Sequence, residues 1–243
     1  MPVAPEWLLA AALVGIYMLD SVHFLAVGEA VVSTRNASLR QLSFGSSFEL
    51  GGRRPYLPNP LTPWWPDLRV DWTASPRGPT AEQATTEMKQ HLRVVQPIAR
   101  LASVCAALVA VAAPVALLAG YQGVFAASVL MCLLCALAGC GLVIRRREGL
   151  GLSLRQAVSL SVVALICLPC SGNLGRAAAI QRRWVVQASH LRDLGFAGTG
   201  RAVSAARLRE MLTRARRLCA EDSGEYQSLT AQLRQLEATD ERH

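Results

Sequence analysis

Two long apolar stretches follow each other in this chain with only residues 121–123 between them. The first, residues 98–120, contains one charged residue, Arg100, and the second, residues 124–144, contains none. A helix needs about 20 residues to cross the hydrocarbon core of a bilayer, and each stretch is long enough. Because the connection is so short, we expect an antiparallel helical hairpin. This hairpin constrains the fold more than any other feature, and it indicates an integral membrane protein that contacts the lipid bilayer.

The composition agrees with this interpretation and excludes several other classes of protein. Charged residues make up 17% of the chain and hydrophobic residues 52%, whereas a soluble domain carries about 25% charged residues. The chain is too apolar to be disordered, it has no fibrous repeat, and its seven cysteines are too few for a disulfide scaffold. The net charge of +8 would suit nucleic acid, but few aromatic residues lie among the basic ones. We therefore expect no nucleic-acid partner.

Two further apolar stretches flank the hairpin. Residues 7–32 are long enough to cross with some tilt, and no Lys or Arg precedes them, so we interpret them as an uncleaved span rather than a signal peptide. Residues 156–175 carry no charge but end in Pro, Ser, Gly and Asn, so this stretch either crosses or enters and turns back. The expected fold class is therefore an all-α integral membrane protein with three to four transmembrane helices around a central helical hairpin.

Four parts of the chain follow from these stretches. They are an N-terminal membrane span (residues 1–32), a cytoplasmic Pro/Trp-rich loop with a short helix (33–97), a membrane domain (98–175) and a C-terminal amphipathic helical tail (176–243). In the loop, residues 41–50 are a candidate strand with a turn at Gly51 and Gly52, and Thr80 begins the short helix with a capping-box spacing. Paired tryptophans beside a membrane are typical of an interfacial anchor, and a partner-docking surface is the alternative.

The basic residues predict the orientation of the chain. Nine of them lie in residues 33–100, four in 145–155 and twelve in 176–243, and the first 32 residues contain none. Because basic segments beside membrane spans stay in the cytoplasm, the ends of the hairpin face inward and the N-terminus faces outward. We expect a cytoplasmic tail, and a tail on the outer side is the alternative, because long tails cross the membrane regardless of their charge. The expected location is the inner membrane of a bacterium, crossed several times, and the bacterial assignment rests only on the excess of Arg over Lys.

The tail contains amphipathic helices of opposite charge. Residues 177–194 predict a basic helix with a tryptophan, residues 202–219 predict a second basic helix, and an acidic helix follows. These helices either pair with each other or bind a partner helix or anionic lipid. The residues expected to contact lipid or a partner, in the loop and in the tail, are Trp64, Trp65, Arg182, Arg183, Trp184, Arg214, Arg216 and Arg217.

Cysteine offers the clearest candidate chemistry. Two CxxC pairs, Cys132 with Cys135 and Cys167 with Cys170, lie in apolar stretches. Such a pair cycles between dithiol and disulfide or holds a soft metal, and the spacing resembles that of membrane thiol–disulfide exchange proteins and thiophilic metal carriers. The alternative is structural, because Cys132 belongs to an i, i+4 ladder of small residues that lets membrane helices approach closely. Cys167 and Cys170 are the better candidates, since their proline and polar neighbours admit water.

A second candidate is the ionisable pair Asp20 and His23 in the first apolar stretch. The two residues are three apart, so they would share one face of a helix. Ionisable residues within a span often mark a path for ions or protons. The alternative is a packing contact in which the two side chains neutralise each other.

No established catalytic motif is present. The chain lacks HExxH, GxSxG, Walker A and dinucleotide-binding signatures, so we expect no catalytic residues and no cofactor, and an enzyme is not favoured. The leading interpretation is a non-enzymatic accessory or scaffold protein that docks a protein partner, a second copy of itself or anionic lipid at the cytoplasmic face. The alternatives are a thiol–disulfide or soft-metal-handling membrane protein that uses the CxxC pairs, and a small ion- or proton-coupled transporter.

Overall fold

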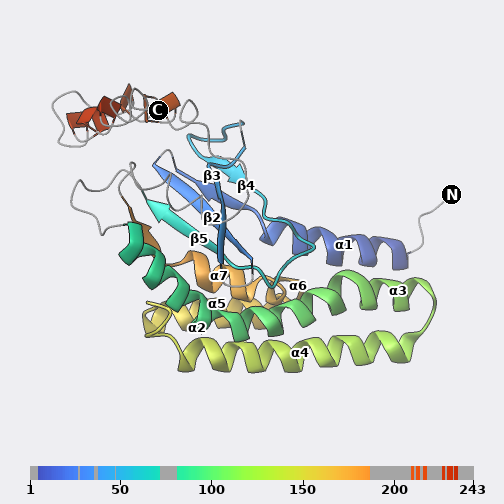
Figure 1. Ribbon diagram of the computed structural model, residues 1–243. Coiled ribbons are helices and arrows are strands. Elements are labelled where there is room, and N and C mark those ends of the chain that lie inside the picture. Colours follow the sequence, from blue (N-terminus) through green and yellow to red (C-terminus); the bar gives the residue numbers. More distant parts are fainter. Residues whose placement is uncertain are drawn as a thin grey trace. The chain divides into compact units, whose positions relative to one another are not determined.

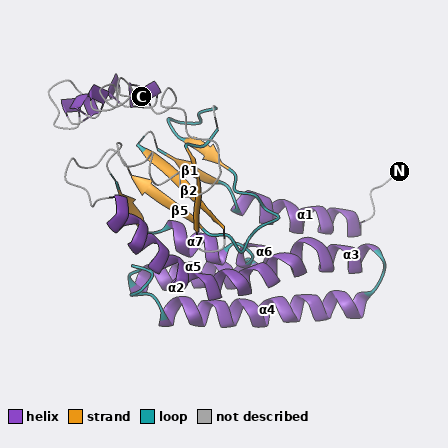
Figure 2. Ribbon diagram, viewed as in Figure 1, coloured by secondary structure: helices purple, strands orange, loops and turns teal. Residues whose placement is uncertain are grey.

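The computed structural model describes residues 5–26, 28–35, 38–46, 48–71 and 81–186, together with scattered helical positions between 209 and 234. These residues form two compact units, whose elements are drawn in Figures 1 and 2. The first, which we call the helical unit, contains Met1–His23, Leu57–Pro66 and His91–Arg182. The second, which we call the sheet unit, contains Phe24–Tyr56, Asp67–Gln90 and Arg183–His243.

The helical unit is built on two long apolar helices. Its elements are α1 (Pro5–Asp20), the larger part of α2 (Ala81–Ala107), η1 (Leu108–Ala112), α3 (Ala113–Leu118), α4 (Gln122–Arg145), α5 (Leu154–Ile166), α6 (Leu168–Ser171) and α7 (Leu174–Ile180). α2, η1 and α3 form one helix that continues through Pro97. Among the described residues, this helix and α4 are the two that are long and apolar enough to cross a membrane. Gly120, at a positive φ, lies in the short turn between them, and α4 packs against α3 and η1, so the predicted hairpin is present.

The expectation of an all-α protein with three to four spans is wrong, because the first apolar stretch is part helix and part sheet. α1 ends at Asp20, and the chain continues as strands β1 (His23–Leu25) and β2 (Glu29–Arg35). Val31 and Val32 point to opposite faces of β2, and both are fully buried. A strand covered on both faces is as continuously apolar as a membrane helix, and for this reason the stretch resembled a span.

The sheet unit contains a four-stranded sheet with the order β3-β2-β5-β6 and a two-stranded sheet of β1 and β4. The strands are orange in Figure 2. The remaining strands are β3 (Ser38–Ser43), β4 (Arg54–Tyr56), β5 (Asp67–Asp71) and β6 (Arg183–Val185). β2 is antiparallel to β3 and to β5, whereas β6 is parallel to β5. Val32 on β2 is paired with Leu68 on β5, which is also fully buried, so the core of this unit lies around these two strands. β3 begins before the candidate strand at residues 41–50, and Gly51 and Gly52 have the positive φ of the expected turn.

Residues 177–194 do not form the single basic helix that their pattern predicts. α7 ends at Ile180, and residues 183–185 pair with β5 as β6. Trp184 is 5% exposed in this strand, so it is a core residue of the sheet unit rather than a contact with a membrane surface. The expected helix start at Thr80 and most of the later tail helices lie outside the described residues.

The stretch at residues 156–175 turns back instead of continuing as one helix. α5 begins with a capping box in which Ser153 and Gln156 exchange hydrogen bonds between side chain and backbone. After α5 ends, α6 and α7 lead the chain back beside it (Figure 1). A Cβ atom on Gly151 would lie 3.3 Å from Cδ of Arg182, so the segment returns to the place where it began. Of the two expectations for this stretch, a helix that crosses or a segment that turns back, the fold adopts the second.

Two glycines let the reversal approach α2 closely. A Cβ atom on Gly175 of α7 would lie 2.5 Å from Cα of Ala99, and one on Gly172 would lie 3.1 Å from Cα of Ala106. Small residues at a helix contact let the two backbones approach, which increases the van der Waals contact between them. α7 therefore packs against the backbone of α2 itself.

We predict that Gly175→Ala destabilises the helical unit. The added methyl group meets the backbone of α2, which cannot move aside without shifting the helix, so the free energy of unfolding should fall by about 2 kcal/mol. Thermal unfolding in detergent, followed by circular dichroism, measures this change. The matched control is Gly141→Ala in α4, where a Cβ atom meets nothing within 4 Å. Equal stability of the two variants would contradict the close contact between α7 and α2.

Candidate functional site

A disulfide joins Cys167 and Cys170 at the chain reversal. Cys167 leaves the helical conformation, with φ −110° and ψ 87°. Pro169 lies in the first turn of α6, where its missing N–H costs no helical hydrogen bond. Both cysteines are half-buried, so the disulfide is not sealed inside the core.

The second CxxC pair has a different backbone and carries free thiols. Cys132 and Cys135 lie inside the regular helix α4. Side chains three residues apart on a helix have Cβ atoms about 5–6 Å apart, whereas a disulfide needs a separation of about 3.5–4.5 Å. The break in the helix at Cys167 removes this obstacle for the first pair. The same sequence spacing therefore permits a disulfide at one place and opposes it at the other.

A pocket of about 120 Å³ lies beside the disulfide. Its lining residues are Asp20, Ser159, Leu160, Val163, Ala164, Cys170, Leu174 and Ala177. Most of this wall is apolar, and its lining residues include Cys170, one member of the disulfide, and the acidic residue Asp20. The pocket thus brings together two groups that the sequence analysis treated as unrelated candidates.

Asn173, in the turn between α6 and α7, holds Asp20 at this pocket. Its Nδ2 donates to Oδ2 of Asp20 at 3.1 Å and to the backbone oxygen of Tyr17 at 3.1 Å. Its Oδ1 accepts from the hydroxyl of Ser21 at 3.1 Å. Asp20 ends α1, outside the two long apolar helices, and burial raises the pKa of its carboxyl while the hydrogen bond from Asn173 lowers it by less. Asp20 therefore holds a proton more readily than an exposed aspartate does.

The predicted pairing of Asp20 with His23 on one helix face is wrong. Asp20 is the last residue of α1, and His23 is the first residue of strand β1. Just past the end of the helix, the hydroxyl oxygen of Ser21 lies 2.9 Å from the backbone oxygen of Tyr17. The transporter interpretation loses the shared face on which it depended.

A buried arginine fixes the Pro/Trp-rich loop within the helical unit. Arg176 on α7 is 1% exposed, and its Nη2 donates to the backbone oxygens of Asn59 and Thr62. The hydroxyl of Tyr17 donates to the backbone oxygen of Pro60 at 2.8 Å. These backbone oxygens of the loop would otherwise need water as a hydrogen-bond donor, and here two side chains from helices take that role.

The residues expected to contact lipid or a partner are dispersed. Trp64 is 45% exposed, and its ring meets that of the half-buried Trp65 edge to face at 6.0 Å. Of the candidate arginines, Arg182 lies beside Gly151, and Arg183 belongs to an ion pair in the sheet unit. Arg216 lies over the ring of Tyr226, and Arg217 is exposed. The side chain of Arg214 lies outside the described residues. They do not form one described surface.

Further thiols gather where α2, α4 and α6 meet. Sγ of Cys105 donates to the backbone oxygen of Cys132 at 3.5 Å, and Sγ of Cys132 lies 3.6 Å from the hydroxyl oxygen of Ser171. Sγ of Cys140 donates to the backbone oxygen of Ser161 at 3.5 Å. Within the described ranges, no three His, Cys, Asp or Glu side chains lie together in a way that could hold a metal ion. The Ser171 contact could not be found from spacing, because it joins residues on different helices.

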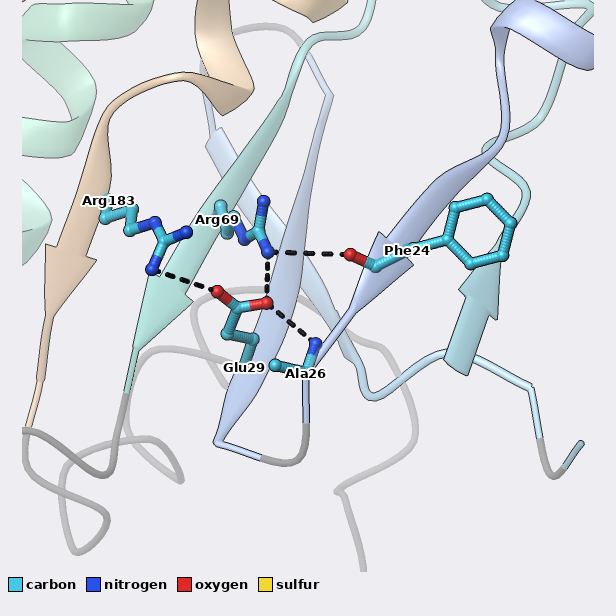
Figure 3. A network of polar contacts seen from close by, with 5 residues as sticks. All are labelled: Phe24, Ala26, Glu29, Arg69 and Arg183. Carbon is cyan, nitrogen blue, oxygen red and sulfur yellow. Dashed lines mark hydrogen bonds and ion pairs between the residues drawn. The ribbon is translucent and has the colours of Figure 1, made fainter. Parts of the chain in front are cut away.

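A buried carboxylate joins three strands of the sheet unit (Figure 3). Glu29 on β2 accepts hydrogen bonds from Arg69 on β5 and from the backbone N–H of Ala26 at 2.7 Å, and Arg183 on β6 lies 3.4 Å away as an ion pair. Burial alone would raise the pKa of Glu29, but the two arginines and the backbone N–H together hold that pKa below its usual value. From its apolar neighbours in the sequence, Glu29 was expected in a membrane span. Its partners Arg69 and Arg183 were not predictable, because no periodic pattern reveals residues so distant in the chain.

Comparison with known proteins offers no template for this arrangement. No protein-family model, no curated protein and no solved structure matches the chain.

We predict that Glu29→Gln destabilises the sheet unit in a pH-dependent way. Because folding lowers the pKa of Glu29, the ionised carboxylate stabilises the fold above the unfolded pKa of about 4.3, and this contribution is lost as the pH falls through the folded pKa. At pH 7 the variant should lose about 3 kcal/mol, since two arginines lose their buried partner. Unfolding measured from pH 7 to pH 3 should show the difference from the native chain shrinking.

The matched control for this prediction is Glu148→Gln. The side chain of Glu148 is 88% exposed and faces Arg147 at 3.6 Å, so its removal should leave stability unchanged at every pH. A pH-independent loss for Glu29→Gln would show that the carboxylate acts by packing alone.

Proposed function

We propose that the helical unit is embedded in a membrane and that its Cys167–Cys170 disulfide exchanges with the thiols of a substrate. The observation that carries this proposal is the pocket in which Cys170 and Asp20 lie together. A purely structural disulfide needs neither an adjoining pocket nor a carboxyl group held beside it. Thiol–disulfide exchange needs access to a sulfur, and a proton donor beside the leaving sulfur accelerates it.

The distribution of apolar side chains supports the membrane location. Of the most apolar 18 residues in each of the two long helices, only 39% and 33% are buried. Val111, Leu130 and Leu134 are each more than half exposed. Such a surface is unfavourable in water, whereas Asn173 and Arg176 are buried inside the unit. An apolar exterior around polar interior groups is typical of a protein surrounded by hydrocarbon.

The basic residues support an orientation for this unit. Residues 145–147 are three arginines that follow the apolar part of α4, and the neighbouring Gly151 and Arg182 mark where the reversal begins and ends. The turn at residues 121–123 contains no basic residue. By the positive-inside rule, the arginine-rich end faces the cytoplasm. The inner membrane of a bacterium remains the predicted location.

The proposed exchange uses the two groups of the pocket in sequence. A thiolate of the substrate attacks the sulfur of Cys170, the bond to Cys167 breaks, and a mixed disulfide forms with Cys170. The sulfur of Cys167 leaves as a thiolate and takes a proton supplied by Asp20. A second substrate thiol then displaces Cys170, whose sulfur takes the proton of that thiol, and Asp20 regains the proton that the first substrate thiol released. The substrate is oxidised to a disulfide, and Cys167 and Cys170 are reduced to thiols.

The first experiment counts thiols in protein that is denatured directly from membranes. Maleimide labelling followed by mass measurement should show two more thiols after reduction than before it, and Cys167→Ser combined with Cys170→Ser should abolish this difference. Seven free thiols both with and without reductant, from a chain with seven cysteines, would contradict the proposal.

The second experiment tests the role of Asp20. Asp20→Asn keeps an oxygen that can accept from Asn173 but cannot give up a proton, so reduction of the disulfide by dithiothreitol should slow by about a hundredfold. The rate is measured by maleimide labelling over time at pH 7. The matched control is Glu6→Gln at the other end of α1, which should react at the native rate. An unchanged rate for Asp20→Asn would remove the carboxyl group from the mechanism.

The accessory or scaffold role remains a prediction. Leu61 is 79% exposed and Trp64 is 45% exposed on the loop that Arg176 and Tyr17 hold, and these side chains suit a docking surface. A scaffold of this kind tolerates loss of the Cys167–Cys170 disulfide apart from any change in stability. The thiol measurements therefore separate the two functions.

A further inference from the structure

Two buried thiols outside the disulfide lie close to each other and to the residue that follows Cys170. Sγ of Cys105 on α2 donates to the backbone oxygen of Cys132 on α4 at 3.5 Å, and both residues belong to one buried cluster. Sγ of Cys132 lies 3.6 Å from the hydroxyl oxygen of Ser171. Both cysteines are 1% exposed. Cys132 is thus in contact with α6, which contains Cys170.

Residues near Cys167 also lie close to this thiol pair, because they pack against the same apolar cluster. Cys105 and Cys132 belong to a buried core between α2, η1 and α4. Leu165 and Leu168, which flank Cys167 in the chain, pack against this core. Residues next to the disulfide in the chain therefore pack against the cluster that contains the thiol pair, which the pocket chemistry does not use.

We propose that Cys105 and Cys132 form a second dithiol–disulfide couple, which exchanges with Cys167–Cys170. This inference rests on the proposed function of the first pair. It also replaces the couple that the sequence spacing predicts, because Cys135 lies on the same regular helix as Cys132 and is poorly placed to pair with it. The couple joins α2 to α4, so its disulfide would link the two arms of the hairpin.

The exchange between the two couples needs no further reactant. The thiolate of Cys132 attacks one sulfur of the Cys167–Cys170 disulfide, that bond breaks, and the released sulfur takes the proton that Cys132 gave up. Cys105 then attacks the sulfur of Cys132, which releases the other sulfur together with the proton of Cys105. One disulfide is reduced to two thiols while two thiols are oxidised to a disulfide, so electrons and protons balance.

The linkage formed on mild oxidation tests this proposal. Full-length protein in membranes is first reduced with dithiothreitol and then oxidised with diamide, and its disulfide-linked peptides are identified by mass spectrometry. We expect the Cys105–Cys132 link to be at least tenfold more abundant than a Cys132–Cys135 link. Cys132→Ser should lose the link, whereas the matched control Cys135→Ser, one turn along the same helix, should keep it.

A trapping experiment tests the transfer itself. Cys105→Ser removes the thiol that resolves the mixed disulfide, so a link from Cys132 to Cys167 or Cys170 should accumulate. Cys105→Ala should trap the same link, which guards against an effect of the buried hydroxyl group on folding. If Cys167–Cys170 exchanges with dithiothreitol but no link to Cys105 or Cys132 forms, the relay is overturned and the proposed function stands. If Cys167–Cys170 exchanges in no assay, both are overturned.

Discussion

The side chain of Asn173 ties the chain reversal to the end of α1, and the candidate site depends on this contact. One amide group satisfies the carboxyl of Asp20, the backbone oxygen of Tyr17 and the hydroxyl of Ser21. A buried polar group that loses its partner costs about 1–3 kcal/mol, so these contacts hold the end of α1 and the reversal in one arrangement. Asp20 reaches the pocket of Cys170 only because of that arrangement.

The two CxxC pairs show that backbone conformation decides what a sequence motif can do. Both pairs have the same spacing, with two residues between the cysteines. One lies across a break in the helix, where the chain changes direction and Pro169 begins a new turn, and it forms a disulfide. The other lies on a continuous helix, and its two thiols are free. The contact between Cys132 and Ser171 then relates the two pairs across helices rather than along the chain.

Sequence reasoning succeeded where one local pattern had one structural meaning. The hairpin was predictable because two uninterrupted apolar stretches and a three-residue connection leave little choice. The first stretch was misread because a strand buried on both faces lacks the alternation that identifies most strands. Trp184 was misread for a related reason, since its basic neighbours suggested a surface helix. The site contacts of Asn173 and the ion pairs of Glu29 join residues far apart in the chain, and no periodicity in a single sequence reveals such partners.

The strand order has a consequence for how the chain is made. β6 pairs in parallel with β5, yet both long helices and the reversal lie between them in the chain. A ribosome therefore releases β2, β3 and β5 well before it synthesises Arg183, the charge partner of Glu29 on the last strand. Until then one edge of β5 has no neighbour, and an unpaired edge is open to association with other chains. During biosynthesis the hairpin thus leaves the ribosome before β6, and the sheet closes only afterwards.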